Sequence, residues 1–331
     1  MKYFLSILFL TGLMMSCKKE AVEVSLIKQP GHFPKPHYNF ANFELNQAGI
    51  DLGKALFYDP ILSFDNSISC ASCHHQSAGF SDPGKSFSLG VDDSLSDRNS
   101  IGLVNLIWSP TFFWDGGVNH LELTGFAPIN NVKEMKEDMN HIVDELYQDN
   151  DYRALFLRAF NEDTITAQRV LWSLAAYMAT LISSESYYDR VYKGEASFNV
   201  EQDKGYKLFQ RDCVSCHTEP LTSNYNFENN GLDEEFEDLG RAQITLNASD
   251  RGKFKVPTLR NITLTAPYMH DGRFNTLNEV IDHYSDGIKM SATLSNKLPE
   301  GFHYTPSEKK ALIKFLETLV DPFFVQNPDF N

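Results

Sequence analysis

The chain has 331 residues, of which 42% are hydrophobic and 22% charged. This composition is ordinary for a globular protein and supplies apolar mass for about two domain-sized cores. The formal net charge of −15 argues against a nucleic-acid-binding protein, because a phosphate backbone would be repelled.

The N-terminal segment has the pattern of a bacterial export signal. Lys2 is followed by an apolar run over residues 3–15, which is too short to span a membrane as a helix. The run ends in Met-Met-Ser-Cys, which resembles the site where a lipoprotein signal is cut before a cysteine that becomes lipidated. We therefore expect a signal peptide over residues 1–16, a lipid on Cys17 that anchors the protein in the periplasm or cell envelope, and a polar tether over residues 17–38. An ordinary secretory signal is the alternative.

Two related halves follow the tether, and we place them at residues 39–188 and 189–331. The pattern Gly53-x-x-Leu56-Phe57 returns as Gly205-x-x-Leu208-Phe209. This weak internal repeat is consistent with duplicated domains. The segment over residues 184–197 reads as the join between the two halves.

Most of the remaining sequence has helical periodicity. Apolar side chains recur on one helical face over residues 170–181, and strand signals are scarce. Thr276 with Glu279 and Thr305 with Glu308 have the spacing of capping boxes, each followed by apolar residues on one side. The sequence therefore predicts a mainly α protein.

Four of the five cysteines form two Cys-x-x-Cys-His motifs, which are attachment sites for c-type haem. Two thiols on one helical turn can bond the two vinyl groups of one porphyrin, and the adjacent histidine can bind the iron. A structural Cys₄ zinc site is the alternative, but the pairs lie far apart and a histidine follows both. His75 is read as a surface residue. We expect two covalent haems c, attached through Cys70, Cys73, His74, Cys213, Cys216 and His217.

The groups on the far side of each iron decide the function. A c-type haem with two protein ligands transfers electrons, whereas a haem with an open face can react with peroxide. Eight segments, in their order along the chain, bear on this question. They are LGKALFYDPILS (52–63), CASCH, DRNS (97–100), FFWDGG (112–117), APINNVKEM (127–135), CVSCH, FKVPTLRNITLTAPYMHDGRF (254–274) and TLNEVIDHY (276–284).

From about Phe43 to Asp321 these segments resemble the bacterial di-haem cytochrome c peroxidases and the related MauG-type enzymes. The resemblance implies two cytochrome c-like haem domains in tandem, with peroxide chemistry at the N-terminal haem and electron entry at the C-terminal one. Many family members close the first haem at rest with a histidine that corresponds to Gly90. Its absence here implies a His74 haem that is open as made, as in MauG-type members.

The resemblance places the sixth ligand of the second haem at Tyr284, where family members have methionine or tyrosine. The helical periodicity also turns Tyr284 inward with Leu277 and Val280. A phenolate is a hard anionic donor and would lower the potential of the iron, whereas a thioether would raise it. A core tyrosine with Met269 or Met290 as the ligand is the alternative.

Two further residues take catalytic roles from the resemblance. Glu134 corresponds to the distal glutamate that moves a proton during O–O cleavage, although in isolation it could be a solvated residue in the first turn of a helix. Trp114 corresponds to the family's tryptophan that relays electrons between the haems. The alternative is a packed core tryptophan, a role that better suits Trp108 or Trp172. The family has a glutamine where this chain has Thr124, and usually an arginine where it has Gly117.

The family's calcium ion would bind Asn99 and the backbone carbonyls of Lys255 and Pro257, since calcium prefers hard oxygen ligands; Asn99 could equally make a turn. The leading function is a peroxidase that reduces hydrogen peroxide with electrons from a small donor such as a cytochrome c or a cupredoxin. The alternatives are a MauG-like oxidase of a protein partner and a two-haem electron carrier. A homodimer is compatible with this reading.

Overall fold

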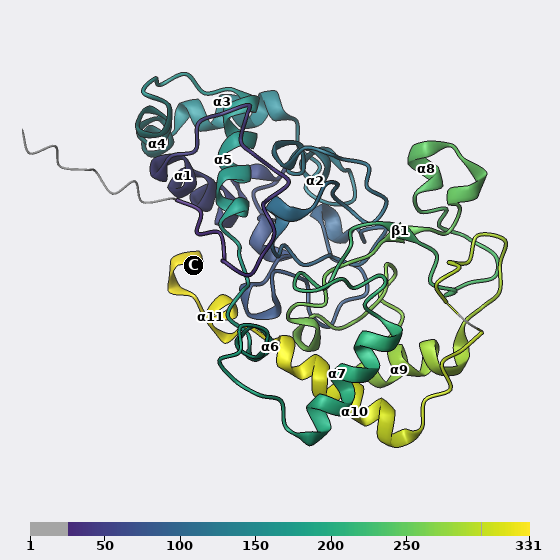
Figure 1. Cartoon of the computed structure of the whole chain (residues 1–331). Helices are drawn as coiled ribbons and strands as arrows, with labels where there is room; N and C mark the ends of the chain where they lie inside the picture. The colour runs from purple at the N-terminus through teal and green to yellow at the C-terminus, as the bar shows by residue number, and fades with distance from the viewer. Residues whose placement is uncertain (1–25, 299) are drawn as a thin grey trace, which may run out of the picture.

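We describe the fold from a computed structural model, which describes residues 26–298 and 300–331. The expected signal peptide and Cys17 lie outside these residues. The N-terminal and C-terminal halves form two helical bodies side by side (Figure 1). The one sheet of the described chain is a single antiparallel pair, β1 (Phe227–Glu228) and β2 (Phe254–Lys255). The prediction of a mainly α protein is confirmed.

Each half is built on one closely packed pair of helices. In the first half α1 (Gln47–Tyr58) packs on α5 (Ala167–Ala179), and in the second α7 (Val200–Asp212) packs on α10 (Pro306–Leu316). A Cβ atom added at Gly53 would lie 1.8 Å from the carbonyl oxygen of Ser173, and one added at Gly205 would lie 1.9 Å from that of Ala311. The repeated glycine therefore marks the same helix crossing in both halves.

Three predicted helical segments agree with the structure. The apolar face over residues 170–181 lies mostly on α5, and both predicted capping boxes are formed, at α9 (Leu277–Asp282) and at α10. The remaining α-helices are short or peripheral. They are α2 (Phe126–Asn130), α3 (Met139–Gln148), α4 (Asn150–Phe160), α6 (Tyr187–Tyr192), α8 (Ala242–Thr245) and α11 (Pro322–Val325).

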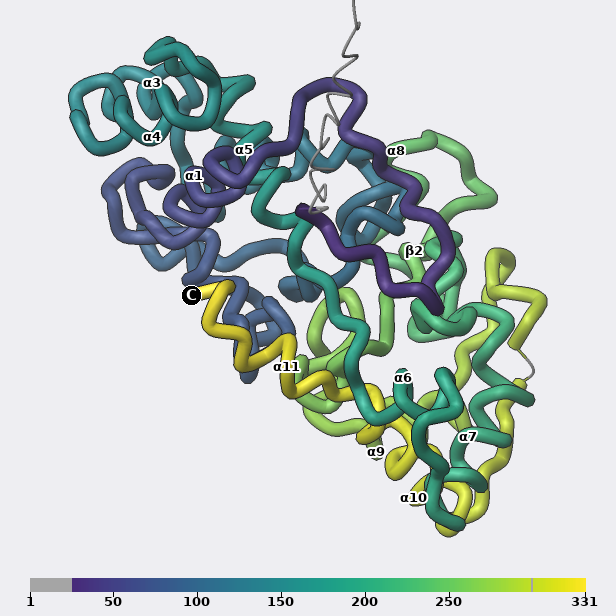
Figure 2. The backbone as a smooth tube through the Cα atoms, turned by 60° about the vertical axis from the view of Figure 1, so that its left-hand side comes forward, coloured from purple at the N-terminus to yellow at the C-terminus, as the bar shows by residue number. Residues whose placement is uncertain are grey.

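The ends of the described chain pack differently from the expected tether and boundary. The segment from residue 26 runs along the body of the protein (Figure 2), and it buries Phe33 against Trp108, whose indole donates to the carbonyl of Pro34. The tether therefore cannot extend to residue 38. At the other end, Phe324 and Phe330 join the hydrophobic core of the first half, so the C-terminal residues belong there by packing.

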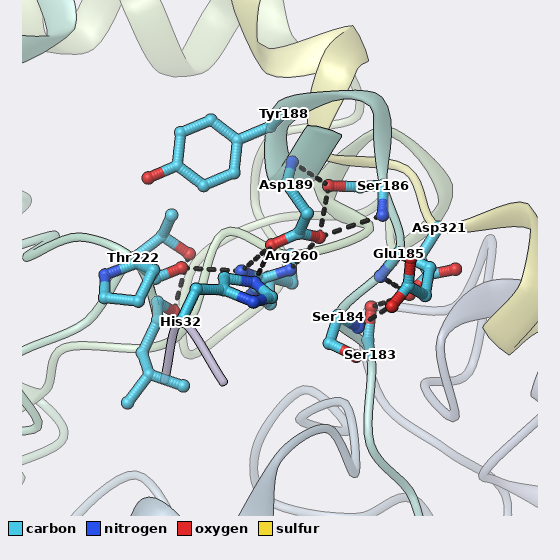
Figure 3. A network of polar contacts seen from close by, with 12 residues as sticks. His32, Ser183, Ser184, Glu185, Ser186, Tyr188, Asp189, Thr222, Arg260 and Asp321 are labelled. Carbon is cyan, nitrogen blue, oxygen red and sulfur yellow. Dashed lines mark hydrogen bonds and ion pairs between the residues drawn. The ribbon is translucent and has the colours of Figure 1, made fainter. Parts of the chain in front are cut away.

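The junction of the halves contains a buried ion pair (Figure 3). Asp189, on α6, accepts two hydrogen bonds from the Arg260 guanidinium at 2.7 and 2.8 Å, and both side chains are fully buried. His32 from the N-terminal segment contacts the same carboxylate at 2.9 Å. Despite the cost of burial, the Arg260 cation lowers the pKa of Asp189 to about 2. The segment expected as a simple join thus contains a helix, α6, whose Asp189 carboxylate binds both Arg260 of the second half and His32 of the N-terminal segment.

Candidate haem and peroxide site

One cavity of about 1080 Å³ runs between the halves, and both Cys-x-x-Cys-His motifs line it. Each motif forms a single tight turn, because the backbone N–H of His74 donates to the carbonyl of Cys70 and that of His217 donates to Cys213. None of the four described cysteines is in a disulfide. This is the arrangement that two thioether attachments on one turn require.

Both motif histidines present one ring nitrogen to the cavity. His74 donates from Nδ1 to the carbonyl oxygen of Phe80 at 2.7 Å, and His217 donates from Nδ1 to that of Thr222 at 3.1 Å. A carbonyl on Nδ1 fixes the tautomer that leaves Nε2 as the metal-binding atom. Burial lowers the pKa of both imidazoles, that of His217 to about 4. The neutral form that binds iron is therefore favoured.

The cavity wall also offers polar groups that fit a haem. Three wall atoms are buried without a hydrogen-bond partner: Ser88 Oγ, Tyr225 Oη and Arg260 Nε. Leaving such groups unpaired is costly, and hydroxyl and guanidinium donors suit the propionate carboxylates of a porphyrin. The sequence patterns gave no signal for Tyr225, which lies in an irregular turn after the second motif.

Glu134 lies in the wall of the first half and shares the cavity with His74. Helix α3 begins only at Met139, so Glu134 sits in a preceding turn rather than in the first helical turn. Asn131 donates to its carboxylate at 2.7 Å, yet burial raises the pKa of Glu134 above its ordinary value. A carboxyl group that is partly shielded from water can accept a proton from a reacting group and return it.

Gly90 lies directly against the backbone that carries Glu134. A Cβ atom there would lie 2.3 Å from the carbonyl oxygen of Lys133 and 2.5 Å from that of Glu134, so any side chain requires this loop to move. His74 is the only histidine among the cavity-lining residues of the described first half. The methionines Met135 and Met178 also line this part of the cavity.

Trp114 lines the same cavity as the two motifs and is held on several sides. Its indole N–H donates to the carbonyl of Asn99 at 2.8 Å, and its own carbonyl accepts from the backbone of Lys255 at 2.7 Å. Arg241 from the second half donates to the carbonyls of Asp115 and Gly116. A guanidinium therefore reaches the loop although position 117 is glycine.

The other two tryptophans pack on aromatic neighbours outside the cavity lining. Trp108 is buried beneath the N-terminal segment, and the partly buried Trp172 stacks on Phe43 with ring centroids 5.5 Å apart. Thr124 lines the cavity, but its hydroxyl donates to the carbonyl of Leu121. His75 is absent from the lining residues and faces Asp82.

The expected calcium ligands also lie along the cavity. Asn99 is buried, and its amide nitrogen donates to the carbonyls of Lys85 and Ser86. The Lys255 ammonium points to the carbonyl of Thr111 at 2.9 Å, and burial lowers the pKa of this lysine to about 8. Asn99 and Lys255 are thus both hydrogen-bonded to Trp114, and the buried Lys255 amine lies beside them.

Two of the three candidate ligands for the second haem lie in the cavity. Tyr284 and Met269 both line it, whereas Met290 is 57% exposed and lies outside. Tyr284 follows α9 in a π-helical turn over His283–Gly287, a feature that often occurs at functional sites. Burial raises the pKa of the Tyr284 hydroxyl to about 12, although a hydrogen bond from Asn230 opposes the shift.

Comparison with known proteins identifies the family. A family model described as di-haem cytochrome c peroxidase matches residues 47–197, and a cytochrome c model matches residues 202–320. The methylamine utilization protein MauG of Methylorubrum extorquens is 35% identical over 298 residues, which cover 88% of this chain and 82% of that protein. The chain belongs to the di-haem cytochrome c peroxidase family.

Other relatives and solved structures agree. The cytochrome c551 peroxidase of Nitrosomonas europaea is 33% identical, with 85% of this chain and 81% of that protein covered. The crystal structure of a MauG-like protein associated with microbial copper homeostasis has a TM-score of 0.84 at 30% identity, covering 92% of this chain and 97% of that one. This di-haem peroxidase is therefore a peroxidase-type oxidoreductase with two haems c, as the motifs predicted.

Proposed function

We propose that this di-haem peroxidase reduces hydrogen peroxide to water at the haem held by His74, with electrons that enter at the haem held by His217. Haem, when bound, supplies the iron that binds peroxide and stores oxidising equivalents. The half-buried carboxyl of Glu134, which lines the same cavity as His74, carries the proposal. Glu134 takes a proton from peroxide as it arrives and returns it to the departing oxygen, so that water can leave.

Trp114 is proposed to relay electrons between the two haems. Its indole lies in the cavity shared by both motifs, and its N–H and carbonyl are both engaged. A fixed aromatic ring is a suitable relay because it needs little rearrangement when its charge changes. The external donor would be a small redox protein, a cytochrome c or a cupredoxin.

Replacing Glu134 with Gln in the haem-loaded protein tests the catalytic role. General acid–base groups contribute about 10²–10⁴-fold to a rate, so the peroxide reaction should slow by that order while haem content stays constant. Glu162→Gln is the matched control, since the Glu162 side chain is 63% exposed. Normal turnover in the Glu134 variant would remove this carboxyl from the mechanism.

A MauG-like oxidase of a protein partner is the second candidate. It is favoured by Gly90, where no imidazole can cap the iron without movement of the Glu134 loop, and by a tyrosine at position 284. Peroxide turnover with reduced cytochrome c separates the two functions, because the oxidase should turn over that donor poorly. A plain electron carrier would instead give two low-spin signals in electron paramagnetic resonance, with no high-spin haem.

The remaining proposals concern the surroundings of the enzyme. A calcium ion bound by Asn99 and the carbonyls of Lys255 and Pro257 would be removed by a chelator, and the relay past Trp114 should then slow. A lipid on Cys17 would anchor the protein to a bacterial membrane in the periplasm. If the protein forms a homodimer, light scattering should give twice the mass of one chain. Over residues 26–298 and 300–331, no helix combines the length and apolar character that crossing a bilayer requires.

A further inference from the structure

The amide of Asn230 lies between the two side chains that compete for the second haem. Its Nδ2 atom is 3.4 Å from Tyr284 Oη and 3.5 Å from Met269 Sδ. A primary amide carries two N–H groups, so one nitrogen can donate to both acceptors. All three residues line the cavity together with His217.

Asn230 is held in place by its backbone neighbours. The His283 ring donates from Nε2 to the Asn230 carbonyl at 3.1 Å. The amide of the preceding residue, Asn229, donates to Ser291 Oγ and Thr293 Oγ1 at 2.9 and 3.0 Å. The side chain of Asn230 therefore projects from a turn whose position is fixed from two sides.

Both acceptors are also set by local backbone geometry. Tyr284 lies in the π-helical turn, where its carbonyl accepts from the backbone N–H of Phe302. Met269 has a φ of +77°, which is unfavourable for a residue with a side chain, and its carbonyl accepts from the N–H of Gly272 in a tight turn. Neither side chain reaches Asn230 through a flexible loop end.

We propose that Asn230 is a positioning residue that selects the Tyr284 oxygen over the Met269 sulfur as the far-side ligand of the haem held by His217. The inference rests on the proposed six-coordinate state of that haem. Oxygen accepts an amide hydrogen bond much better than a thioether does, and the bond strengthens when the oxygen is anionic. Without the amide, the buried phenolate loses this stabilisation, and the sulfur beside it becomes the better ligand.

Replacing Asn230 with Leu in the haem-loaded protein tests the selection. Hydrogen bonds to charged groups contribute about 1.5–3 kcal/mol, so the ratio of tyrosine-ligated to methionine-ligated haem should fall by about tenfold or more. The low-spin electron paramagnetic resonance signal should change, a methionine-to-iron absorption band should appear in the far red, and the potential of this haem should rise. Asn226→Leu is the control, because the same change is made at an exposed position of the same segment.

Asn230→Asp is the second variant, because it keeps the shape of the side chain and removes both N–H donors. It should shift the same spectral signals in the same direction as Asn230→Leu. It therefore still tests the proposal if the larger leucine disturbs haem loading. A wild-type spectrum and potential in both variants would overturn the role of Asn230. The Tyr284→Phe variant distinguishes a failure of the Asn230 role from a failure of the ligand assignment. If its low-spin signal is unchanged, Tyr284 is not a ligand, and the inference is overturned as well.

Discussion

Replacing Gly90 with Ala should slow the peroxide reaction about a hundredfold while both haems stay attached. The added Cβ would lie 2.3 Å from the carbonyl oxygen of Lys133 and 2.6 Å from the Cα atom of Glu134, whereas ordinary contact begins near 3.4 Å. The Glu134 loop must therefore withdraw by about 1 Å, and a misplacement of about 1 Å can cost about 10²-fold in rate. Overpacking of this kind also lowers the free energy of unfolding by about 1–3 kcal/mol.

The assay for the Gly90 variant is a stopped-flow measurement of the oxidised protein mixed with hydrogen peroxide, alongside denaturant unfolding. Gly31→Ala is the control, because no atom lies within 4 Å of a Cβ placed there. If the Gly90 variant reacts at the wild-type rate and unfolds at the same denaturant concentration, the loop contact does not position Glu134. A slow variant that has also lost haem would refute the argument equally, because the attachment turn would then be the damaged element.

Three further predictions follow from the packing and the charges. Asp189→Asn should lower the free energy of unfolding by about 3–5 kcal/mol, because the buried Arg260 cation loses its partner. Since the folded-state pKa of Asp189 is depressed to about 2, the free energy of unfolding of the wild-type protein should fall by about 2 kcal/mol between about pH 4 and about pH 2. Acid titration of the variant should not show this loss. Gly53→Ala should prevent close packing on Ser173 and lower the thermal midpoint, whereas an unchanged midpoint would mean that the helices separate at little cost. Trp114→Phe should leave the peroxide reaction of the oxidised protein intact but slow electron transfer between the haems in flash-reduction kinetics, and equal transfer rates would exclude the indole as a relay.

Much of the fold was predictable because local rules determine it. The capping boxes at Thr276 and Thr305 specify helix starts through side-chain contacts only three residues apart. The haem motifs could also be identified from the sequence, since attachment of the porphyrin requires a fixed spacing of the two cysteines and the histidine. The repeated glycines at positions 53 and 205 are weak evidence in the sequence for duplicated halves. The structure strengthens this evidence, because both glycines lie at a helix crossing.

What could not be predicted depends on contacts between distant segments. No local pattern links His32 to Asp189, or Asn230 to Met269 and Tyr284, because these residues are far apart in the sequence and their side chains meet only in the folded chain. The reading of Glu134 as a residue in the first turn of a helix is also wrong, since α3 begins only at Met139. The roles of Glu134, Trp114 and Tyr284 remain predictions that the experiments above address.

The return of the last residues to the first half has a consequence for biogenesis. Phe324 and Phe330 complete a core whose other members were made long before them, and the Tyr177 hydroxyl donates to the carbonyl of Phe330. A chain that emerges from its N-terminus cannot finish this core until residues 324–330 are available. The first half should therefore complete its folding only after the second half has been synthesised.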